Sequence, residues 1–163
     1  MKVVVLFLGN PIYRDDAVGI EVGKRLMGEL EKMGIDTHIL EKTGLSLLDY
    51  IHGYDMVIIV DGIRSNKHPV GHVYELDGDL MKSMSVFSPH YAGLPEALMA
   101  IHALELLRPN FIHIIAIETK DPYTIGDNIS LEISEKLDSI TKNVFDIIMK
   151  ITRRGDHINC NQS

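Results

Sequence analysis

Acidic side chains and one histidine follow apolar segments of this chain at several points. Asp15 and Asp16 lie in the sequence GNPIYRDDAVG, directly after the first apolar run. Asp61 follows the apolar sequence MVIIV, and His90 lies in the loop sequence SPHYAGL. Carboxylate oxygens and an imidazole nitrogen can bind a divalent transition metal such as nickel, zinc or iron. Asp16, Asp61 and His90 are therefore candidate metal ligands that would leave coordination positions open.

Motifs for several other chemistries are absent from the sequence. After the first apolar run the chain reads Gly9-Asn10-Pro11, which departs from the dinucleotide motif G-x-G-x-x-G, and Pro11 lacks the N–H that a pyrophosphate would use. Neither the P-loop motif G-x-x-x-x-G-K-[ST] nor the nucleophile motif G-x-S-x-G occurs. The single cysteine, Cys160, excludes a disulfide or a cysteine-based metal site within the chain.

Alternating strand and helix patterns predict the elements that would position these side chains. Apolar runs and one alternating segment predict five strands, at residues 2–8, 37–40, 56–60, 71–76 and 111–117. Apolar residues at helical spacing predict helices at residues 16–34, at 45–51, from 95 onward and at 133–151. This order predicts a three-layer α/β/α fold with a mostly parallel, twisted sheet of about five strands. Because no helix precedes residues 71–76, we expect them to form an antiparallel edge strand.

The predicted sheet brings distant polar residues to one edge. Asn10, Asp61 and Glu118 each follow the end of a predicted buried strand. Ligands of open α/β sheets bind beyond the carboxyl ends of the strands. We therefore expect these residues to lie along one edge, together with Asp16 and the loop that carries His90.

Each of these residues also has a purely structural interpretation. Asp15 and Asp16 could serve as a helix cap and a first-turn acid, and we assign this role to Asp15. Glu118 could simply end a strand, and a lone loop histidine such as His90 is often not a ligand. Asp61 is harder to explain in this way, because an acid that ends an apolar strand is partly buried and needs a partner.

Composition and charge limit the class of protein. The 163 residues, 45% of them hydrophobic, fit one domain, which we place at residues 1–152, with a polar, disordered tail at residues 153–163. A net charge of -7 argues against a nucleic-acid or membrane partner, because such partners need clustered lysine and arginine. The first apolar run is too short for a signal peptide or a membrane span, so we expect a cytoplasmic protein.

Three segments in order, GNPIYRDDAVG, IIVDGI and SPHYAGL, resemble the three motifs of the nickel-iron hydrogenase maturation endopeptidases. The resemblance extends from Gly9 to about Asp121 and includes the turn KTG that ends at Gly44. Two departures concern loop geometry. Ala17 stands where many members have glycine, and the glycine-rich turn of the family is reduced to Gly44.

The resemblance implies a role for each motif. A carboxylate of the first motif, an aspartate at the third strand and a histidine of the third motif bind the metal in that family. Carried over to this chain, the metal-binding and catalytic residues are Asp16, Asp61 and His90. The residues that we assign to substrate binding are Asn10, Gly44 and Gly93.

The implied activity is that of a metal-dependent, aspartyl-type endopeptidase. It would remove the C-terminal extension of a nickel-iron hydrogenase large-subunit precursor after nickel insertion. The resemblance implies that the nickel belongs to the substrate, so no tightly bound cofactor is expected. Cadmium or zinc could replace it. Whether Asp16 or Asp61 acts as the general base stays open.

Two alternatives remain at this point. The first alternative is a receiver domain, whose acidic pair, phosphoacceptor and lysine are imitated by Asp15, Asp16, Asp61 and Lys120. The chain would then be a signalling switch that binds magnesium at the acids. That interpretation gives His90 no task, and its acidic pair would directly follow the first strand. The second alternative is a chaperone that binds the hydrogenase subunit without cutting it.

Overall fold

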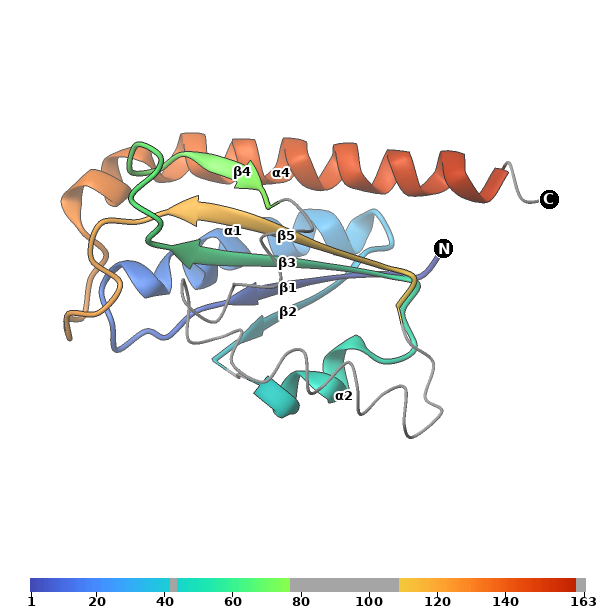
Figure 1. The fold of residues 1–163 in the computed structure, drawn as a ribbon, viewed down its shortest axis with the longest axis horizontal. Helices are drawn as coiled ribbons and strands as arrows, with labels where there is room; N and C mark the ends of the chain where they lie inside the picture. Colours follow the sequence, from blue (N-terminus) through green and yellow to red (C-terminus); the bar gives the residue numbers. More distant parts are fainter. Residues whose placement is uncertain (42–43, 77–108, 161–163) are drawn as a thin grey trace.

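Five strands form one sheet in the order β2-β1-β3-β5-β4 (Figure 1). The computed structural model describes residues 1–41, 44–76 and 109–160, and for residues 44–45 and 156–160 it describes secondary structure alone. The strands are β1 Val3–Leu8, β2 Asp36–Leu40, β3 Met56–Ile63, β4 Val73–Glu75 and β5 Phe111–Glu118. All neighbours pair in parallel except β4, which pairs antiparallel with β5 at the edge. The predicted sheet with its antiparallel edge strand is confirmed.

Helices cover both faces of this sheet. They are the 3-10 helix η1 (Asp15–Ala17), α1 (Val18–Lys32), η2 (Gly44–Leu47), α2 (Leu48–Ile51) and α4 (Leu131–Cys160). Figure 1 shows α1 and α4 on one face and α2 on the other, which confirms the three-layer fold. The helix predicted from residue 95 onward lies outside the described residues. None of the helices in the described ranges is both long and apolar enough to cross a bilayer.

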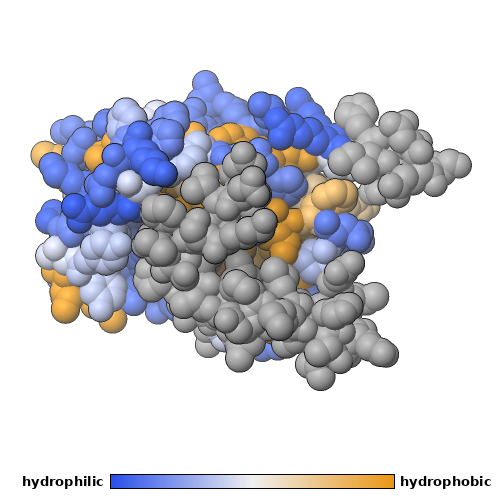
Figure 2. Space-filling model, viewed as in Figure 1, coloured by the Kyte–Doolittle hydropathy of each residue, from blue (hydrophilic) through white to orange (hydrophobic). Residues whose placement is uncertain are grey.

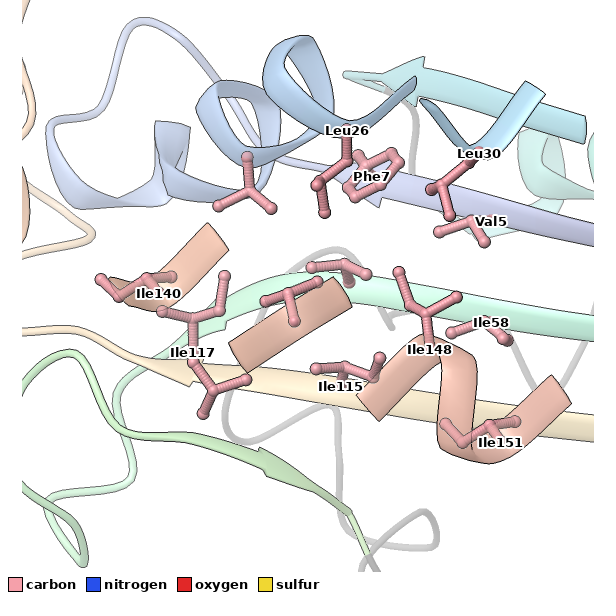
Figure 3. Packing of buried hydrophobic residues seen from close by; sticks show 14 of the residues in the cluster. Val5, Phe7, Leu26, Leu30, Ile58, Ile115, Ile117, Ile140, Ile148 and Ile151 are labelled. Carbon is pink, nitrogen blue, oxygen red and sulfur yellow. The ribbon is translucent and has the colours of Figure 1, made fainter. Parts of the chain in front are cut away.

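Alternate side chains of the strands fill two apolar cores. Strand residues that face α1 and α4 form the first core, which includes Val5, Phe7, Ile58, Ile115, Ile117, Leu26, Leu30, Ile140, Ile148 and Ile151 (Figure 3). Residues on the opposite face form the second core with α2, which includes Val4, Leu6, Leu8, Val57, Ile59, Ile63, Leu47 and Ile51. The central strands are thus apolar on both faces, as parallel sheets covered by two helical layers require.

The third strand extends beyond its predicted end. Asp61 was expected directly after the strand, but it lies inside β3, opposite Ala116 of β5. The strand continues because Gly62 and Ile63 pair with the last two residues of β5, of which Glu118 is the final one. Asp61 is therefore a fully buried strand residue.

The last helix continues beyond residue 152, where the predicted domain ends, and reaches Cys160. A Cβ at Gly155 would lie 2.5 Å from Cε of Met1 and 2.7 Å from Cε of Met56, so this part of α4 lies against the beginning of the sheet. Residues 153–160, assigned to a polar tail from the sequence, are helical. The division of the chain into domain and tail stays a prediction.

Helix α1 lies close to β1 because glycine replaces a side chain at the contact. A Cβ at Gly19 would overlap the carbonyl oxygen of Leu8, and one at Gly23 would lie 2.7 Å from the ring of Phe7. Gly28 is in the same helix, but apart from its chain neighbours and the backbone of that helix no atom lies within 4 Å of the position of its Cβ. Gly19 and Gly23 thus set the distance between α1 and the sheet.

We expect Gly19→Ala to lower the free energy of unfolding by about 3 kcal/mol, because the new methyl group must displace backbone. Gly28→Ala is the matched control and should raise it by about 0.5–1 kcal/mol, since alanine favours the helix. Urea denaturation of both variants measures the difference. Equal stability of the two variants would show that α1 does not depend on this close approach.

Candidate active site

The candidate site lies at the carboxyl ends of β1 and β3. From β1 the chain passes through η1 and α1 to β2 on one side, whereas β3 lies on the other side of β1. Open α/β sheets bind ligands in the crevice at the carboxyl ends of two such neighbouring strands, where the strand order reverses. The four buried acids of the described residues all lie near this edge: Asp15, Asp16, Asp61 and Glu118.

Asp16 and Asp61 lie on elements that pack directly against each other. A Cβ at Gly9 would overlap the backbone oxygen of Asp16, and one at Gly62 would lie 3.2 Å from the backbone oxygen of Asp15. The short helix η1 therefore rests on the ends of β1 and β3. Asp16 is 3% exposed and Asp61 is fully buried. Two of the three predicted site residues thus occur at one edge of the sheet.

Asp15 has a structural role that differs from the predicted helix cap. Its buried carboxylate accepts hydrogen bonds from the backbone N–H groups of Lys120 (3.3 Å), Asp121 (2.9 Å) and Ser130 (2.7 Å). Ser130 directly precedes α4, so the negative charge lies at the N-terminus of a long helix, where the helix dipole favours it. Neither η1 nor α1 has a side-chain cap hydrogen bond. Asp15 therefore joins η1 to the loop after β5 instead of capping its own helix.

Asn10 shapes the loop that precedes η1. Its side-chain Oδ1 accepts a hydrogen bond from the N–H of Ile12 at 3.0 Å, and its backbone oxygen accepts one from the N–H of Tyr13 at 3.2 Å. Asparagine commonly forms such turns after a strand. The observed role of Asn10 is therefore structural, and its contact with substrate stays a prediction.

Glu118 holds the segment that follows β3. Its buried carboxylate accepts hydrogen bonds from the N–H groups of Ser65 and Asn66, both at 2.8 Å, and from the hydroxyls of Ser65 at 2.6 Å and Tyr74 at 3.2 Å. Burial raises the pKa of the Tyr74 hydroxyl, which therefore stays protonated as a donor. Asn66 has a φ of 59°, a left-handed conformation that the hydrogen bond to Glu118 helps to fix. Glu118 thus does more than end β5, because it fixes the chain just after the strand of Asp61.

Of the other predicted site residues, one lies within the described ranges. Gly44 is the first residue of η2, which follows β2 at the same edge of the sheet. His90 and Gly93 lie outside the described residues. Across the described ranges, no three histidine, cysteine, aspartate or glutamate residues are placed to hold a metal ion. The set of Asp16, Asp61 and His90 therefore stays a prediction.

Two of the residues expected for a receiver domain have other partners in the structure. The side chain of Lys120 is 68% exposed, and its Nζ lies 3.6 Å from the carboxylate of Glu132. The carboxylate of Asp15 binds three backbone N–H groups. Both groups thus have structural partners, which disfavours a phosphoacceptor site.

The roles of Asp15 and Glu118 were missed from the sequence because their partners, many of them backbone N–H groups, lie far along the chain. Ser130 is 115 residues from Asp15, and Ser65 is 53 residues from Glu118. Every residue except proline carries an N–H, so such partners leave no mark in residue type. The available signal was the position of Glu118 directly after a buried apolar run.

We expect Asp15→Asn to lower the free energy of unfolding by about 3 kcal/mol, since the amide loses the charge and places an NH2 donor against backbone donors. Asp127→Asn, at an exposed position of the loop before α4, is the control and should change stability by less than about 0.5 kcal/mol. Thermal and urea denaturation provide the comparison. If both variants were equally stable, the carboxylate of Asp15 would not hold the loop.

Comparisons with known proteins concern the family and the fold of the chain. A family model described as hydrogenase maturation protease matches residues 20–151. The chain is 28% identical over 145 residues to Protein FrxA of Pyrococcus furiosus, which covers 87% of this chain and 98% of the relative. It is 30% identical over 108 residues to the hydrogenase 2 maturation protease of Escherichia coli, which covers 62% of this chain and 63% of the relative.

Solved structures show the same fold. The hydrogenase maturating endopeptidase HybD of Escherichia coli superposes with a TM-score of 0.72 at 20% identity, covering 92% of this chain and 93% of that one. The [NiFe] hydrogenase maturation protease HybD of Thermococcus kodakarensis gives a TM-score of 0.67 at 23% identity. The match covers 90% of this chain and 99% of that one. Because the family model spans most of its length, the chain belongs to the hydrogenase maturation protease family.

Proposed function

We propose that the chain is an endopeptidase that removes the C-terminal extension from the precursor of a nickel-iron hydrogenase large subunit, after nickel has entered that subunit. The observation that carries the proposal is the placement of two buried acids, Asp16 and Asp61, on adjoining elements at the point where the strand order reverses. Membership of the maturation protease family supports it. Carboxylates at this edge suit a divalent cation that is already bound to the substrate when the substrate enters the site.

The nickel ion is part of the substrate in this proposal. Two carboxylates and the imidazole of His90 would supply an incomplete coordination shell, so the chain would bind nickel weakly without the precursor. A nickel ion already held by the precursor could complete its shell with Asp16, Asp61 and His90. The enzyme would thus recognise that nickel insertion is finished. Cadmium or zinc could take the same place.

Cleavage would use water close to this metal. The ion can polarise the scissile carbonyl or orient the attacking water, and either Asp16 or Asp61 can take the proton from that water. The same carboxyl group can then pass the proton to the leaving amine. A carboxylate as general base corresponds to an aspartyl-type endopeptidase activity.

Other parts of the proposal concern substrate binding and location. We propose that Asn10, Gly44 and Gly93 contact the precursor near the cut. Asn10 follows β1 and Gly44 follows β2 at the carboxyl edge of the sheet. We also propose that the protein acts in the cytoplasm and needs no nucleic acid or membrane.

We expect each of three substitutions to lower the rate at which nickel-loaded precursor is processed by at least about 100-fold: Asp61→Asn, Asp16→Asn and His90→Ala. Each of them removes a metal ligand or the general base. The mass change of purified precursor on a gel measures processing, and thermal denaturation verifies folding. Asp127→Asn should process at the wild-type rate. A folded variant that still processes at that rate would remove its residue from the mechanism.

Precursor without nickel should stay uncut under conditions in which nickel-loaded precursor is fully processed, because the metal joins the two proteins. The same gel compares both forms, with and without added nickel. Cleavage of the metal-free precursor at full speed would contradict recognition through nickel. Stable binding of nickel-loaded precursor without any cut would favour a chaperone.

A further inference from the structure

The loops beside η1 expose large apolar side chains. Ile12 is 58% exposed, Tyr123 is 54% exposed and Ile125 is 73% exposed. Figure 1 places the loops after β1 and β5 together at one end of the molecule, and Figure 2 shows hydrophobic side chains among hydrophilic ones there. These residues lie on the same edge as Asp16, which follows Ile12 by four positions in the sequence.

Two of these side chains belong to a short two-stranded ribbon. We name residues 12–14 and 124–126 the rim ribbon. The N–H of Arg14 donates to the backbone oxygen of Thr124 at 3.0 Å, and the N–H of Gly126 donates to that of Ile12 at 3.0 Å. Tyr13 and Ile125 form the antiparallel pair between these bonds. The bond between Gly126 and Ile12 places the exposed Ile12 and Ile125 on directly adjoining segments of the ribbon.

The rim ribbon is held in place by hydrogen bonds at its base. The N–H of Asp15 donates to the backbone oxygen of Asp121 at 3.1 Å, and the carboxylate of Asp15 accepts from the same loop. Hydrogen bonds from Thr124, together with the nearby charge of Arg14, lower the pKa of Asp121, so its carboxylate stays charged in the loop. A preformed loop loses little conformational entropy when it binds a partner.

We propose that the rim ribbon is a docking element that presses Ile12, Ile125 and the neighbouring Tyr123 against an apolar surface of the protein substrate. This inference rests on the proposed function and names the surface that brings the substrate to Asp16. The loop of Ile12 leads directly into η1, so a partner seated on the ribbon lies beside the candidate site.

The size and charge of the patch favour this occupant. A stable dimer interface needs about 20–30 residues from each partner, whereas this patch has three large apolar side chains. The charged groups of Arg14 and Asp121 lie 3.7 Å apart and offset each other beside the patch, so its apolar side chains are the feature that a partner can bind. An apolar contact of this size fits a substrate that binds transiently, is cut and leaves.

The test compares the double variant Ile12→Ser, Ile125→Ser with Met33→Ser. Met33 is 49% exposed and follows the end of α1, away from the carboxyl edge of the sheet. With the nickel-loaded precursor that the wild type processes, the double variant should raise KM at least about tenfold and leave kcat within about twofold, whereas Met33→Ser should change neither. Binding of that precursor to the Asp61→Asn protein should weaken by the same factor when the two serines are added.

Tyr123→Ser gives a second test, because its position lies outside the paired residues of the ribbon. It should also raise KM, with an unchanged midpoint of thermal denaturation. Unchanged KM in both variants would overturn the docking role and leave the proposed function intact. A wild-type dimer that the double variant converts to a monomer would assign the patch to a second copy instead. If the wild type processes no nickel-loaded precursor, the proposed function fails and the docking role fails with it.

Discussion

One buried carboxylate, that of Asp15, joins the parts of the chain on which the candidate site depends. It binds backbone N–H groups of the loop after β5 and of the first residue before α4, although these groups are more than 100 residues away in the sequence. Hydrogen bonds to a charged acceptor in a buried position are stronger than those between neutral groups. The position of η1, and with it that of Asp16, therefore depends on a residue that has no need to touch the substrate.

Close backbone approaches complete this arrangement. Gly9 and Gly62 allow η1 to rest on the ends of β1 and β3, and Gly19 allows α1 to follow β1 closely. Side chains at these positions would push η1 away from the strand ends and separate Asp16 from the end of β3. The order of the strands determines at which edge of the sheet the site lies. The glycines determine how closely the elements that carry the acids can approach each other there.

Sequence patterns predicted the layers and strand pairing because apolar runs on both faces leave few ways to build a parallel sheet. They did not predict how far β3 extends, since its last residues are held by pairing with β5, which has no local signal. The position of Asp16 and Asp61 at one edge followed from topology alone. The structural roles of Asp15 and Glu118 could not be predicted in this way, because backbone donors are the same for nearly every residue type.

The geometry gives Asp15, one of the two adjacent acids of the first motif, a structural role. Three backbone N–H groups compensate the charge of Asp15, so that carboxylate is a structural anion. Glu118 is held in the same way by Ser65 and Asn66. Buried acids bound by such fixed donors gain little from a cation, because the donors would have to be displaced first. The structural roles of Asp15 and Glu118 therefore rest on their observed donors, whereas the metal role proposed for Asp16 and Asp61 rests on the family resemblance and on their place at the edge of the sheet.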